Sequence, residues 1–273
     1  MVDVIGAVQY IEQHGSDVHK AMARYAVGAA MSGAVLTALE PLQRPDGGWT
    51  GLDPDCPDDL STISCTWMAL QYLRWIGVDS TPLIDSTVTF LAAQQHPDGY
   101  WDEPDAIAQY NAPPHMQPGE AATRMWLAAA VARMLLETGH DTQVYFGPAL
   151  TYLSEQWEAG TLRGKNARLH PLWMMLPLFK MVGHARDAHI VESCNNRLLA
   201  AVEFEELDPM DVTAVAHAAM ATRFAGNRLY IAARDYVLTQ QQGDGGFTTH
   251  YGDRRRPNAT VDALMLMRWG GLI

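Results

Sequence analysis

The sequence predicts an all-α fold, a single α/α toroid of about six helical hairpin repeats that spans residues 1–273 as one domain. Three observations lead to this prediction. A short loop with glutamine, Asp-Gly and an aromatic residue recurs along the chain. Prolines that precede apolar segments recur about every 50 residues, and no run alternates apolar and polar residues as a strand would. Each repeat is expected to pair an inner apolar helix with an outer amphipathic helix.

The recurring loop is found three times, as QRPDGGW at 43–49, QQHPDGYW at 94–101 and QQQGDGGF at 240–247. Trp49 and Trp101 are 52 positions apart, and Phe247 follows after 146 more, close to three such steps. Asp-Gly is a strong turn signal because glycine readily adopts a positive φ. We therefore expect these loops to be structural staples, in which the ring packs over the turn and the glutamine binds the helix end.

Prolines are expected to open the inner helices, because the first helical position has no use for an N–H group. The prolines are Pro57, Pro118, Pro171, Pro209 and Pro257. Apolar residues at helical spacing follow them, as in STISCTWMALQYLRWIG from position 61. Segments with a more polar face, such as TPLIDSTVTFLAAQQ from position 81, are the expected outer helices. The apolar C-terminal stretch ALMLMRWGGLI favours a closed ring, because an open solenoid would need polar caps.

The composition narrows the possible functions. Charged residues make up 18% of the chain and the formal net charge is -12, so a nucleic-acid partner is not expected. Cys56, Cys65 and Cys194 contain no CxxC pair, and their odd number argues against a disulfide framework, so a cytoplasmic location is expected. No signal peptide and no membrane span is recognisable, whereas peripheral membrane contact stays open.

Adjacent carboxylates near an expected inner helix are the first candidates for chemistry. Asp58 and Asp59 follow Pro57, and Asp53 and Asp55 stand just before them. A helix N-terminus strengthens an acid, and a neighbouring carboxylate opposes double ionisation, so such a pair can keep one proton. The alternative is that these residues only complement the helix dipole, a contribution of about 0.3–1 kcal/mol.

The three loops resemble the QW repeats of the terpene cyclase and protein prenyltransferase superfamily. The residues that carry the resemblance are Gln43, Gly48, Trp49, Gln95, Gly99, Trp101, Gln241, Gly246 and Phe247. The resemblance covers most of the chain at the level of repeat spacing, and it implies an α/α toroid. The superfamily includes squalene–hopene cyclase-like enzymes, class II terpene cyclases and prenyltransferase β-subunits, so the loops do not distinguish between these activities.

In the class II terpene cyclases of this superfamily, an Asp-x-Asp-Asp motif opens an inner helix, and its middle aspartate protonates an alkene or epoxide. The aligned residues here are Cys56-Pro57-Asp58-Asp59. The resemblance implies that Asp58 is the general acid and Asp59 its partner. Asp55 is then the residue expected to replace the missing first aspartate. The leading hypothesis is a class II terpene cyclase-like isomerase or lyase that starts cyclisation or isomerisation of an isoprenoid by protonation.

The same hypothesis expects an aromatic cavity, because aromatic faces stabilise cations. Trp126, Trp173 and Phe179 lie on inner segments and are the candidates, although core packing is their commoner role. Arg124 is expected to pair with Glu120 and is a further substrate-binding candidate. No cofactor is required, and Mg²⁺ would be needed only by a diphosphate substrate.

Two further groups of charged residues adjoin expected inner helices. Arg254, Arg255 and Arg256 precede the last one and could bind a diphosphate with help from its N-terminus, or they could form a solvated basic patch. Asp208, Asp211 and Asp262 are expected at the same end of the toroid, and the spacing of Asp208 and Asp211 fits a helix cap.

Three alternatives stay open. The first is a non-catalytic toroid that binds a lipid or another protein. The second is a partner-dependent, prenyltransferase β-subunit-like protein. Such β-subunits hold zinc with an Asp-x-Cys pair, but Asp55 and Cys56 are adjacent, so no metal site is predicted. The third is a glycan-active enzyme that uses separated carboxylates such as Asp58 and Glu120. A homodimer is compatible with each of them.

Overall fold

The fold is described by a computed structural model that covers residues 2–110, 112–113, 116–140, 146–163, 168–222 and 227–273. Within these ranges the chain forms twelve α-helices and no β-strand, only isolated bridges in the loops, so the all-α prediction is confirmed. The helices are α1 Val4–His14, α2 Asp17–Ala26, α3 Ser32–Leu39, α4 Ile63–Trp75, α5 Pro82–Gln94, α6 Ala121–Glu137, α7 Phe146–Glu158, α8 His170–Val182, α9 Ala188–Glu203, α10 Pro209–Ala221, α11 Arg228–Leu238 and α12 Arg256–Trp269.

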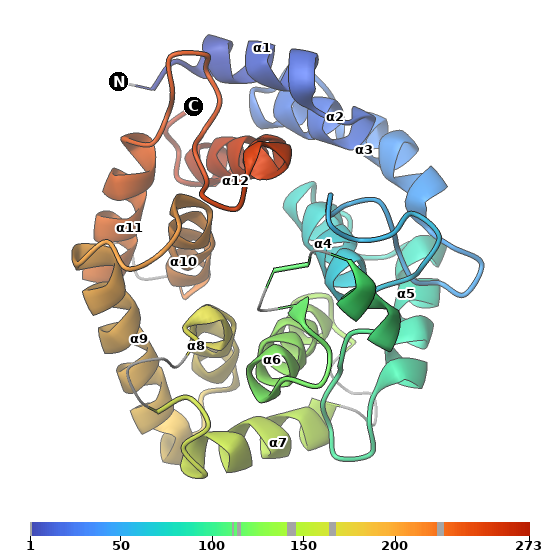
Figure 1. Cartoon of the computed structure of the whole chain (residues 1–273), viewed down its shortest axis with the longest axis vertical. Helices are drawn as coiled ribbons and strands as arrows, with labels where there is room; N and C mark the ends of the chain where they lie inside the picture. The colour runs from blue at the N-terminus through green and yellow to red at the C-terminus, as the bar shows by residue number, and fades with distance from the viewer. Residues whose placement is uncertain (1, 111, 114–115, 141–145, 164–167, 223–226) are drawn as a thin grey trace. The chain divides into compact units, whose positions relative to one another are not determined.

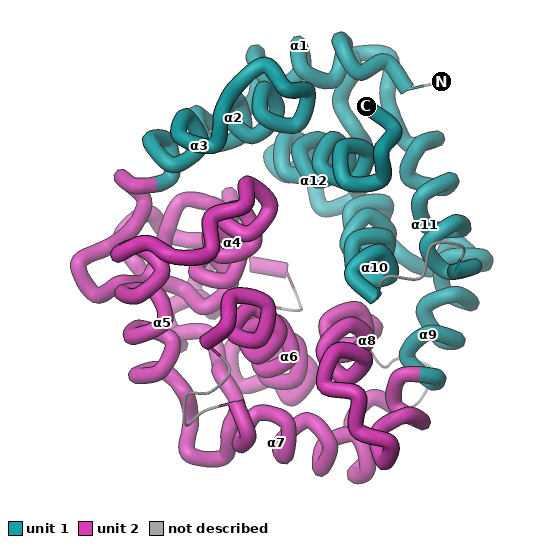
Figure 2. The backbone as a smooth tube through the Cα atoms, turned by 180° about the vertical axis from the view of Figure 1, so that it is seen from behind, with its two compact units in different colours: residues 1–39, 192–273 teal, residues 40–191 magenta. Residues whose placement is uncertain are grey.

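The chain divides into two compact units (Figure 2). Unit 1 contains residues 1–39 and 192–273, and unit 2 contains residues 40–191. Helix α9 begins in unit 2 and continues into unit 1. The predicted closure of all repeats into one toroid, and the single domain that it implies, concern the arrangement of the two units and stay predictions.

Unit 2 is built around α6, which packs against α4, α7 and α8, while α5 packs against α4 (Figure 1). Nearly every residue of α6 from Thr123 to Leu135 is buried, as expected for a helix that is apolar on all sides. The proline prediction holds for α8, α10 and α12, which carry a proline in the first turn. It is wrong for α4 and α6. Helix α4 begins at Ile63 because the Thr62 side chain caps the N–H of Cys65. Helix α6 begins at Ala121, three positions after Pro118.

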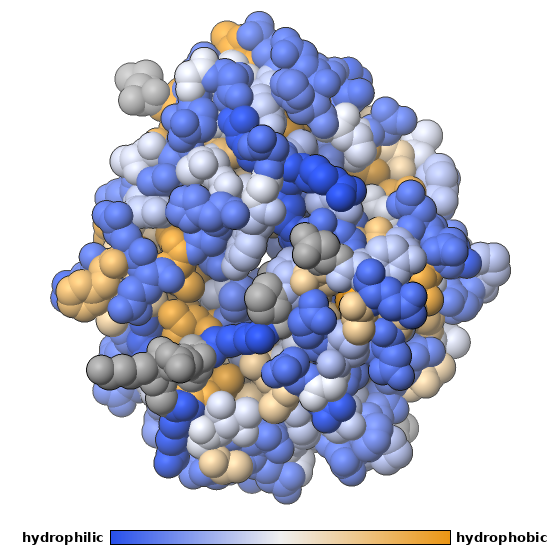
Figure 3. Space-filling view, viewed as in Figure 1, coloured by the Kyte–Doolittle hydropathy of each residue, from blue (hydrophilic) through white to orange (hydrophobic). Residues whose placement is uncertain are grey.

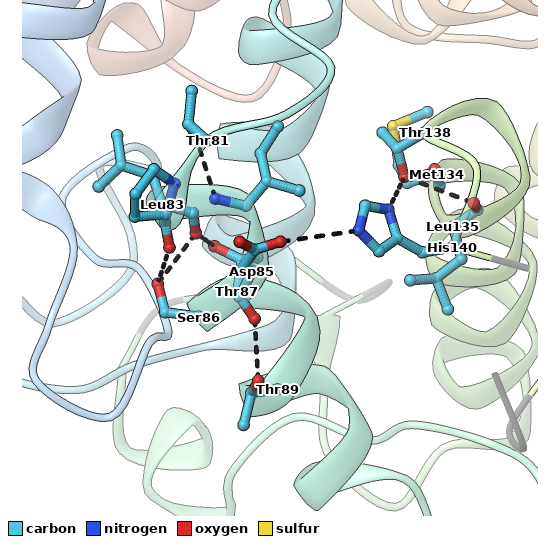
Figure 4. A network of polar contacts seen from close by, with 12 residues as sticks. Thr81, Leu83, Asp85, Ser86, Thr87, Thr89, Met134, Leu135, Thr138 and His140 are labelled. Carbon is cyan, nitrogen blue, oxygen red and sulfur yellow. Dashed lines mark hydrogen bonds and ion pairs between the residues drawn. The ribbon is translucent and has the colours of Figure 1, made fainter.

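A network of polar contacts connects α5 to the C-terminal end of α6 (Figure 4). The His140 ring lies 4.0 Å from the Asp85 carboxylate of α5 and 3.2 Å from the Thr138 hydroxyl. Thr138 in turn donates to the carbonyl of Met134 in the last turns of α6. Within unit 2, the outer helix α5 therefore contacts the end of α6 as well as α4.

Unit 1 has α10 and α12 at its centre, and α11, α1 and α2 pack around them. The N-terminal helix is joined to the loop before α12, because the Gln241 side chain exchanges two hydrogen bonds of 2.7 Å with the backbone of Asp3. The two ends of the chain thus belong to one unit.

The three glutamine loops have one geometry, and it agrees with the staples expected from the sequence. Gly47, Gly99 and Gly245 adopt φ values of +88°, +95° and +91°. A Cβ atom on any of them would lie 2.2–2.3 Å from a backbone oxygen of an outer helix. The loop glutamine donates back to the same glycine, as Gln43 does to the carbonyl of Gly47 at 3.2 Å. Glycine is required here both for its φ and for the close approach.

The face of the molecule in Figure 3 is mostly hydrophilic, with apolar residues in small groups. Among the described residues, no helix combines the length and apolar character needed to span a bilayer. Peripheral membrane contact stays a prediction.

Candidate active site

Asp58 and Asp59 lie in an exposed turn, not in the first turn of a helix. The turn ends before Thr62, the cap of α4, so both carboxylates precede the helix start at Ile63. The prediction that they open an inner helix is therefore wrong in its geometry. The reason is that Thr62 provides a side-chain cap for the backbone, and Pro57 does not.

The residues around Asp58 form a loop with its own hydrogen bonds. Asp55 is half-buried, and its backbone N–H donates to the Asp53 carboxylate at 2.9 Å. Cys56 is buried, and the Thr62 hydroxyl contacts its sulfur at 3.8 Å. A hydrogen bond with Cys65 and burial both raise the pKa of the Cys56 thiol, so it stays neutral. Cys56 therefore supplies no charge to Asp58.

The acid that does meet the start of α4 is Glu103, which the sequence did not single out. Its carboxylate accepts the backbone N–H groups of Ile63 and Ser64, both at 3.0 Å, and the Ser64 hydroxyl. Glu103 is 3% exposed, and burial raises its pKa to about 7. Both of its oxygens are occupied by the helix end, so we assign Glu103 a capping role.

A cleft of about 670 Å³ adjoins Glu103 in unit 2. Its acidic lining residues are Asp46, Asp102, Glu103 and Asp105, and its aromatic ones include Phe90 and Tyr100. Neither Asp58 nor Glu120, the pair named for a glycan-active enzyme, lines this cleft. The predicted pair of carboxylates is therefore not part of it.

The aromatic candidates are core residues of unit 2. Trp126, Trp173 and Phe179 are 5%, 3% and 1% exposed. Trp126 packs edge-on against Trp67 with 5.5 Å between ring centroids, and Trp173 packs against His170 at 4.7 Å. Their rings are covered by protein, and a role toward a cation stays a prediction.

The arginine candidates are divided among different partners. Arg124 does not bind Glu120 as predicted, but donates to Asp102 at 2.6 Å and lies over the Tyr100 ring. Arg256 pairs with Asp244 at 2.7 Å and covers the Tyr10 ring. Arg254 is exposed and Arg255 is 3% exposed, so the three consecutive arginines do not form one patch. Of these residues, Arg255 is the one whose charge acts on the buried carboxyl group of Asp211, which is described next.

The Asp211 cluster, formed by Asp208, Asp211, Tyr251 and Arg255 in unit 1, combines a buried acid with hydrogen-bond donors. Asp211 lies in the first turn of α10 and is 7% exposed. The Tyr251 hydroxyl donates to its carboxylate at 2.6 Å. Burial raises the pKa of Asp211 to about 7, and the charge of Asp208 acts in the same direction. The Tyr251 hydrogen bond and the Arg255 charge oppose this rise.

Asp208 holds the cluster in place. It caps α10 by accepting the N–H of Met210 at 2.8 Å, as its spacing predicted. It also accepts the Thr249 hydroxyl at 2.8 Å and the N–H of His250 at 2.5 Å. These bonds fix the loop that carries Tyr251. Burial, followed by the charge of Asp211, raises the pKa of Tyr251, so its hydroxyl keeps the proton that it donates.

The described residues contain no group of three or more histidine, cysteine, aspartate or glutamate side chains arranged to hold a metal ion. Mg²⁺ as a partner of a diphosphate substrate stays a prediction.

No family model and no curated protein matches this chain. Solved structures with a similar backbone include a variant of the type II terpene cyclase MstE from Scytonema in complex with merosterolic acid A, its product. That match has a TM-score of 0.64 at 12% identity and covers 99% of this chain and 96% of the other. A second MstE variant, bound to its substrate geranylgeranyl dihydroxybenzoate, has a TM-score of 0.59 at 14% identity, with coverages of 98% and 88%.

This chain has the fold of the type II terpene cyclases. A protein from Actinoplanes has a similar backbone, with a TM-score of 0.60 at 14% identity and coverages of 98% and 100%. At these identities the likeness concerns the fold. It agrees with the terpene cyclase-like fold that the resemblance implied, while the assignment of these loops as QW repeats stays a resemblance.

Proposed function

We propose that this protein catalyses the proton-initiated cyclisation or isomerisation of an isoprenoid, with the Asp211 carboxyl group as the proton donor. The observation that carries the proposal is the buried Asp211 carboxyl, whose pKa is about 7 and which accepts the Tyr251 hydroxyl at 2.6 Å. A general acid must hold its proton before the reaction, and a raised pKa allows a carboxyl group to do so near neutral pH.

Proton transfer would run from the Asp211 oxygen to one carbon of a substrate double bond. The O–H bond breaks, the π electrons form the new C–H bond, and the second alkene carbon becomes a cation. The carboxylate left behind is stabilised by the Tyr251 hydrogen bond, the N-terminus of α10 and the charge of Arg255. These three contributions make Asp211 a stronger acid than burial alone would leave it.

The isoprenoid substrate class is supported by the fold. The similar MstE structures carry geranylgeranyl dihydroxybenzoate as substrate and merosterolic acid A as product. An isoprenoid is therefore the proposed partner of this chain. A homodimer, a cytoplasmic location and diphosphate binding by Arg254 or Arg255 stay predictions.

Asp211 replaces Asp58 as the favoured donor for a physical reason. Asp58 and Asp59 are exposed, whereas Asp211 is buried and its pKa is raised to about 7 by that burial. Asp58 is also substituted in the experiment, because the motif resemblance implies that it is the acid.

The test is a mass-spectrometric screen of geranyl, farnesyl and geranylgeranyl diphosphates, squalene and geranylgeranyl dihydroxybenzoate, run in H₂O and D₂O. A proton-initiated reaction in D₂O places one deuterium from the acid in the product. We expect Asp211→Asn to abolish product formation, because an amide preserves shape but has no transferable acid proton. Glu206→Gln, at an exposed carboxylate in the same unit, is the matched control.

Two results would contradict the proposal. Product formation that survives Asp211→Asn but is lost in Asp58→Asn would return the role to the motif residue. Product without deuterium would mean that protonation does not start the reaction.

A non-catalytic binding module is the second candidate, because the three aromatic candidates are at most 5% exposed and so offer no open aromatic wall in unit 2. Binding of an isoprenoid without turnover by the wild-type protein would favour this alternative.

A further inference from the structure

Asp262 is the exception in an otherwise buried helix. From Pro257 to Met267 every residue of α12 is buried except Asp262, which keeps part of its surface accessible. Among the described residues no hydrogen bond or ion pair reaches its carboxylate. Burial alone raises the pKa of Asp262 to about 7. A half-buried carboxyl group that has no partner in the described part of the chain is costly to keep in a fold unless it serves another purpose.

The surroundings of Asp262 follow from two contacts between α10 and α12. At one level, Tyr251, just before α12, donates to Asp211 in the first turn of α10. His217 follows Asp211 by six residues on α10, and its ring donates to the backbone carbonyl of Asp262, within α12, at 3.0 Å. The two helices therefore run in the same direction. Asp262 lies about 9 Å beyond the level of Asp211, at 1.5 Å of rise per residue.

The accessible face of α10 also borders Asp262. Met210 and Ala214 are the residues in its first turns that keep accessible surface, and they are one helical turn apart. His217 follows Ala214 by three positions, so these residues lie on one stripe of the helix. Since His217 contacts Asp262, the stripe borders Asp262. The accessible strip is thus apolar along Met210 and Ala214 and ends at a lone carboxyl group.

We propose that Asp262 is the counter-ion for a cationic group of an apolar ligand that lies along this strip of unit 1. The ligand class is a protonated amine on a hydrocarbon tail or, resting on the proposed function, the carbocation formed from an isoprenoid. A desolvated carboxylate without a partner attracts a cation more strongly than a solvated one does, because the surroundings do not screen the charge. Asp211 would then form the cation, and Asp262 would stabilise it deeper along the strip.

The experiment uses the full chain and two probes, a tertiary amine that carries a farnesyl tail and its neutral carbon isostere. Calorimetry gives the affinity of each probe at pH 7 for wild type, Asp262→Asn and the control Glu206→Gln. We expect wild type and Glu206→Gln to prefer the amine by at least about tenfold. Asp262→Asn should lose this preference and keep its affinity for the neutral probe.

Three outcomes decide the proposal. An equal preference for the amine in wild type and Asp262→Asn would overturn it, and so would failure of the amine to bind wild type. If Asp262→Asn does not fold, as judged by circular dichroism, Asp262→Ala takes its place, because alanine favours a helix. If neither variant folds, a measurement on wild type alone tests the proposal. Binding of the amine near pH 7 must then release protons, seen as heats that depend on the buffer, and no release would overturn the proposal.

The result is separable from that of the proposed function. An amine preference that depends on Asp262, without turnover of any isoprenoid, would support the counter-ion and reject the cyclase. Turnover that depends on Asp211, without any amine preference, would support the cyclase and reject the counter-ion.

Discussion

Glu103 and Asp211 are buried and Asp262 is half-buried, whereas Asp58 is exposed. Burial raises the pKa of each of the three carboxyl groups to about 7. Their partners then separate their roles: Glu103 is occupied by the end of α4, Asp211 accepts the Tyr251 hydroxyl, and Asp262 has no hydrogen-bond partner for its carboxylate among the described residues. Of the three, Asp211 has both a proton to give and groups that stabilise the carboxylate afterwards.

Tyr251→Phe should move the pH dependence of turnover. The Tyr251 hydrogen bond lowers the pKa of Asp211, so removing it should raise that pKa above about 7. A general acid works in its protonated form, so the decline of activity at high pH should move to higher pH in Tyr251→Phe. The maximal rate should fall, because a weaker acid transfers its proton less readily. A pH–rate profile identical to that of wild type would contradict the role of Tyr251.

The pH dependence of the stability of the fold should also reveal the raised pKa of Asp211, without any substrate. The pKa of Asp211 is higher in the folded chain, about 7, than the ordinary value of 3.8. Its protonation therefore stabilises the fold fully below about pH 4, and this contribution is lost as the pH rises through about 7. The difference in the free energy of unfolding between wild type and Asp211→Asn should therefore change between about pH 4 and about pH 7. Urea unfolding at a series of pH values measures it.

Asp58→Asn should behave as a surface change. Asp58 is exposed and precedes the cap of α4, so we expect the free energy of unfolding to change by less than about 1 kcal/mol. Urea unfolding of the two proteins measures this. A loss of more than about 2 kcal/mol would show that the loop 51–60 depends on this carboxylate.

At the scale of the element, the glutamine loops connect the helices through backbone contact. In each loop a glycine with positive φ packs against a backbone oxygen of an outer helix. The loop glutamine donates a hydrogen bond to the carbonyl of the same glycine. In the two loops that carry a tryptophan, the indole N–H adds a buried donor, as Trp101 does to the carbonyl of Leu91 at 2.7 Å. The loops therefore hold the outer helices in place by direct packing. None of the loop residues belongs to the Asp211 cluster.

Gly99→Ala should destabilise the protein by more than a positive φ alone explains. The new Cβ would lie 2.2 Å from the carbonyl oxygen of Pro148, so α7 would have to move. Gly139→Ala is the matched control, because Gly139 has a φ of +77° and no atom near its missing Cβ. We expect about 1–2 kcal/mol for the control and clearly more for Gly99→Ala. Equal values in thermal or urea unfolding would contradict the close contact.

At the scale of the whole molecule, the two ends of the chain complete one unit. Unit 1 joins residues 1–39 to residues 192–273, and Gln241 connects them through its two bonds to Asp3. Gly245 approaches the carbonyl of Gly6 in α1 at the same place. The last loop of the repeat therefore acts on the first helix of the chain.

Gln241→Ala should lower the stability of the fold by about 1–3 kcal/mol, because it leaves several polar groups at the junction of α1 and the last loop without their partner. Gln240→Ala is the matched control, since in the described part of the chain the Gln240 side chain bonds only the neighbouring Thr239. Urea unfolding of both variants and wild type measures the difference. Equal losses would contradict the role of Gln241 in joining the two ends.

Local patterns in the sequence were sufficient for the all-α class, for the prolines that begin α8, α10 and α12, and for the three turns with Asp-Gly. They were also sufficient for the Asp208 cap of α10, which its spacing predicted. Each of these features depends on residues within a few positions of one another. Helix propensity, capping and glycine φ act over that range, so they can be read along the chain.

The tertiary structure alone decided which carboxyl groups are buried and what they bind. Glu103 reaches α4 across 39 and 40 positions, Tyr251 reaches Asp211 across 40, and Arg124 leaves Glu120 for Asp102. Asp58 resembles a motif acid in sequence but remains in water. Burial and partners come from chain segments that meet only in the folded state. The pKa of a carboxyl group, and with it the choice of acid, therefore cannot be derived from the motif alone.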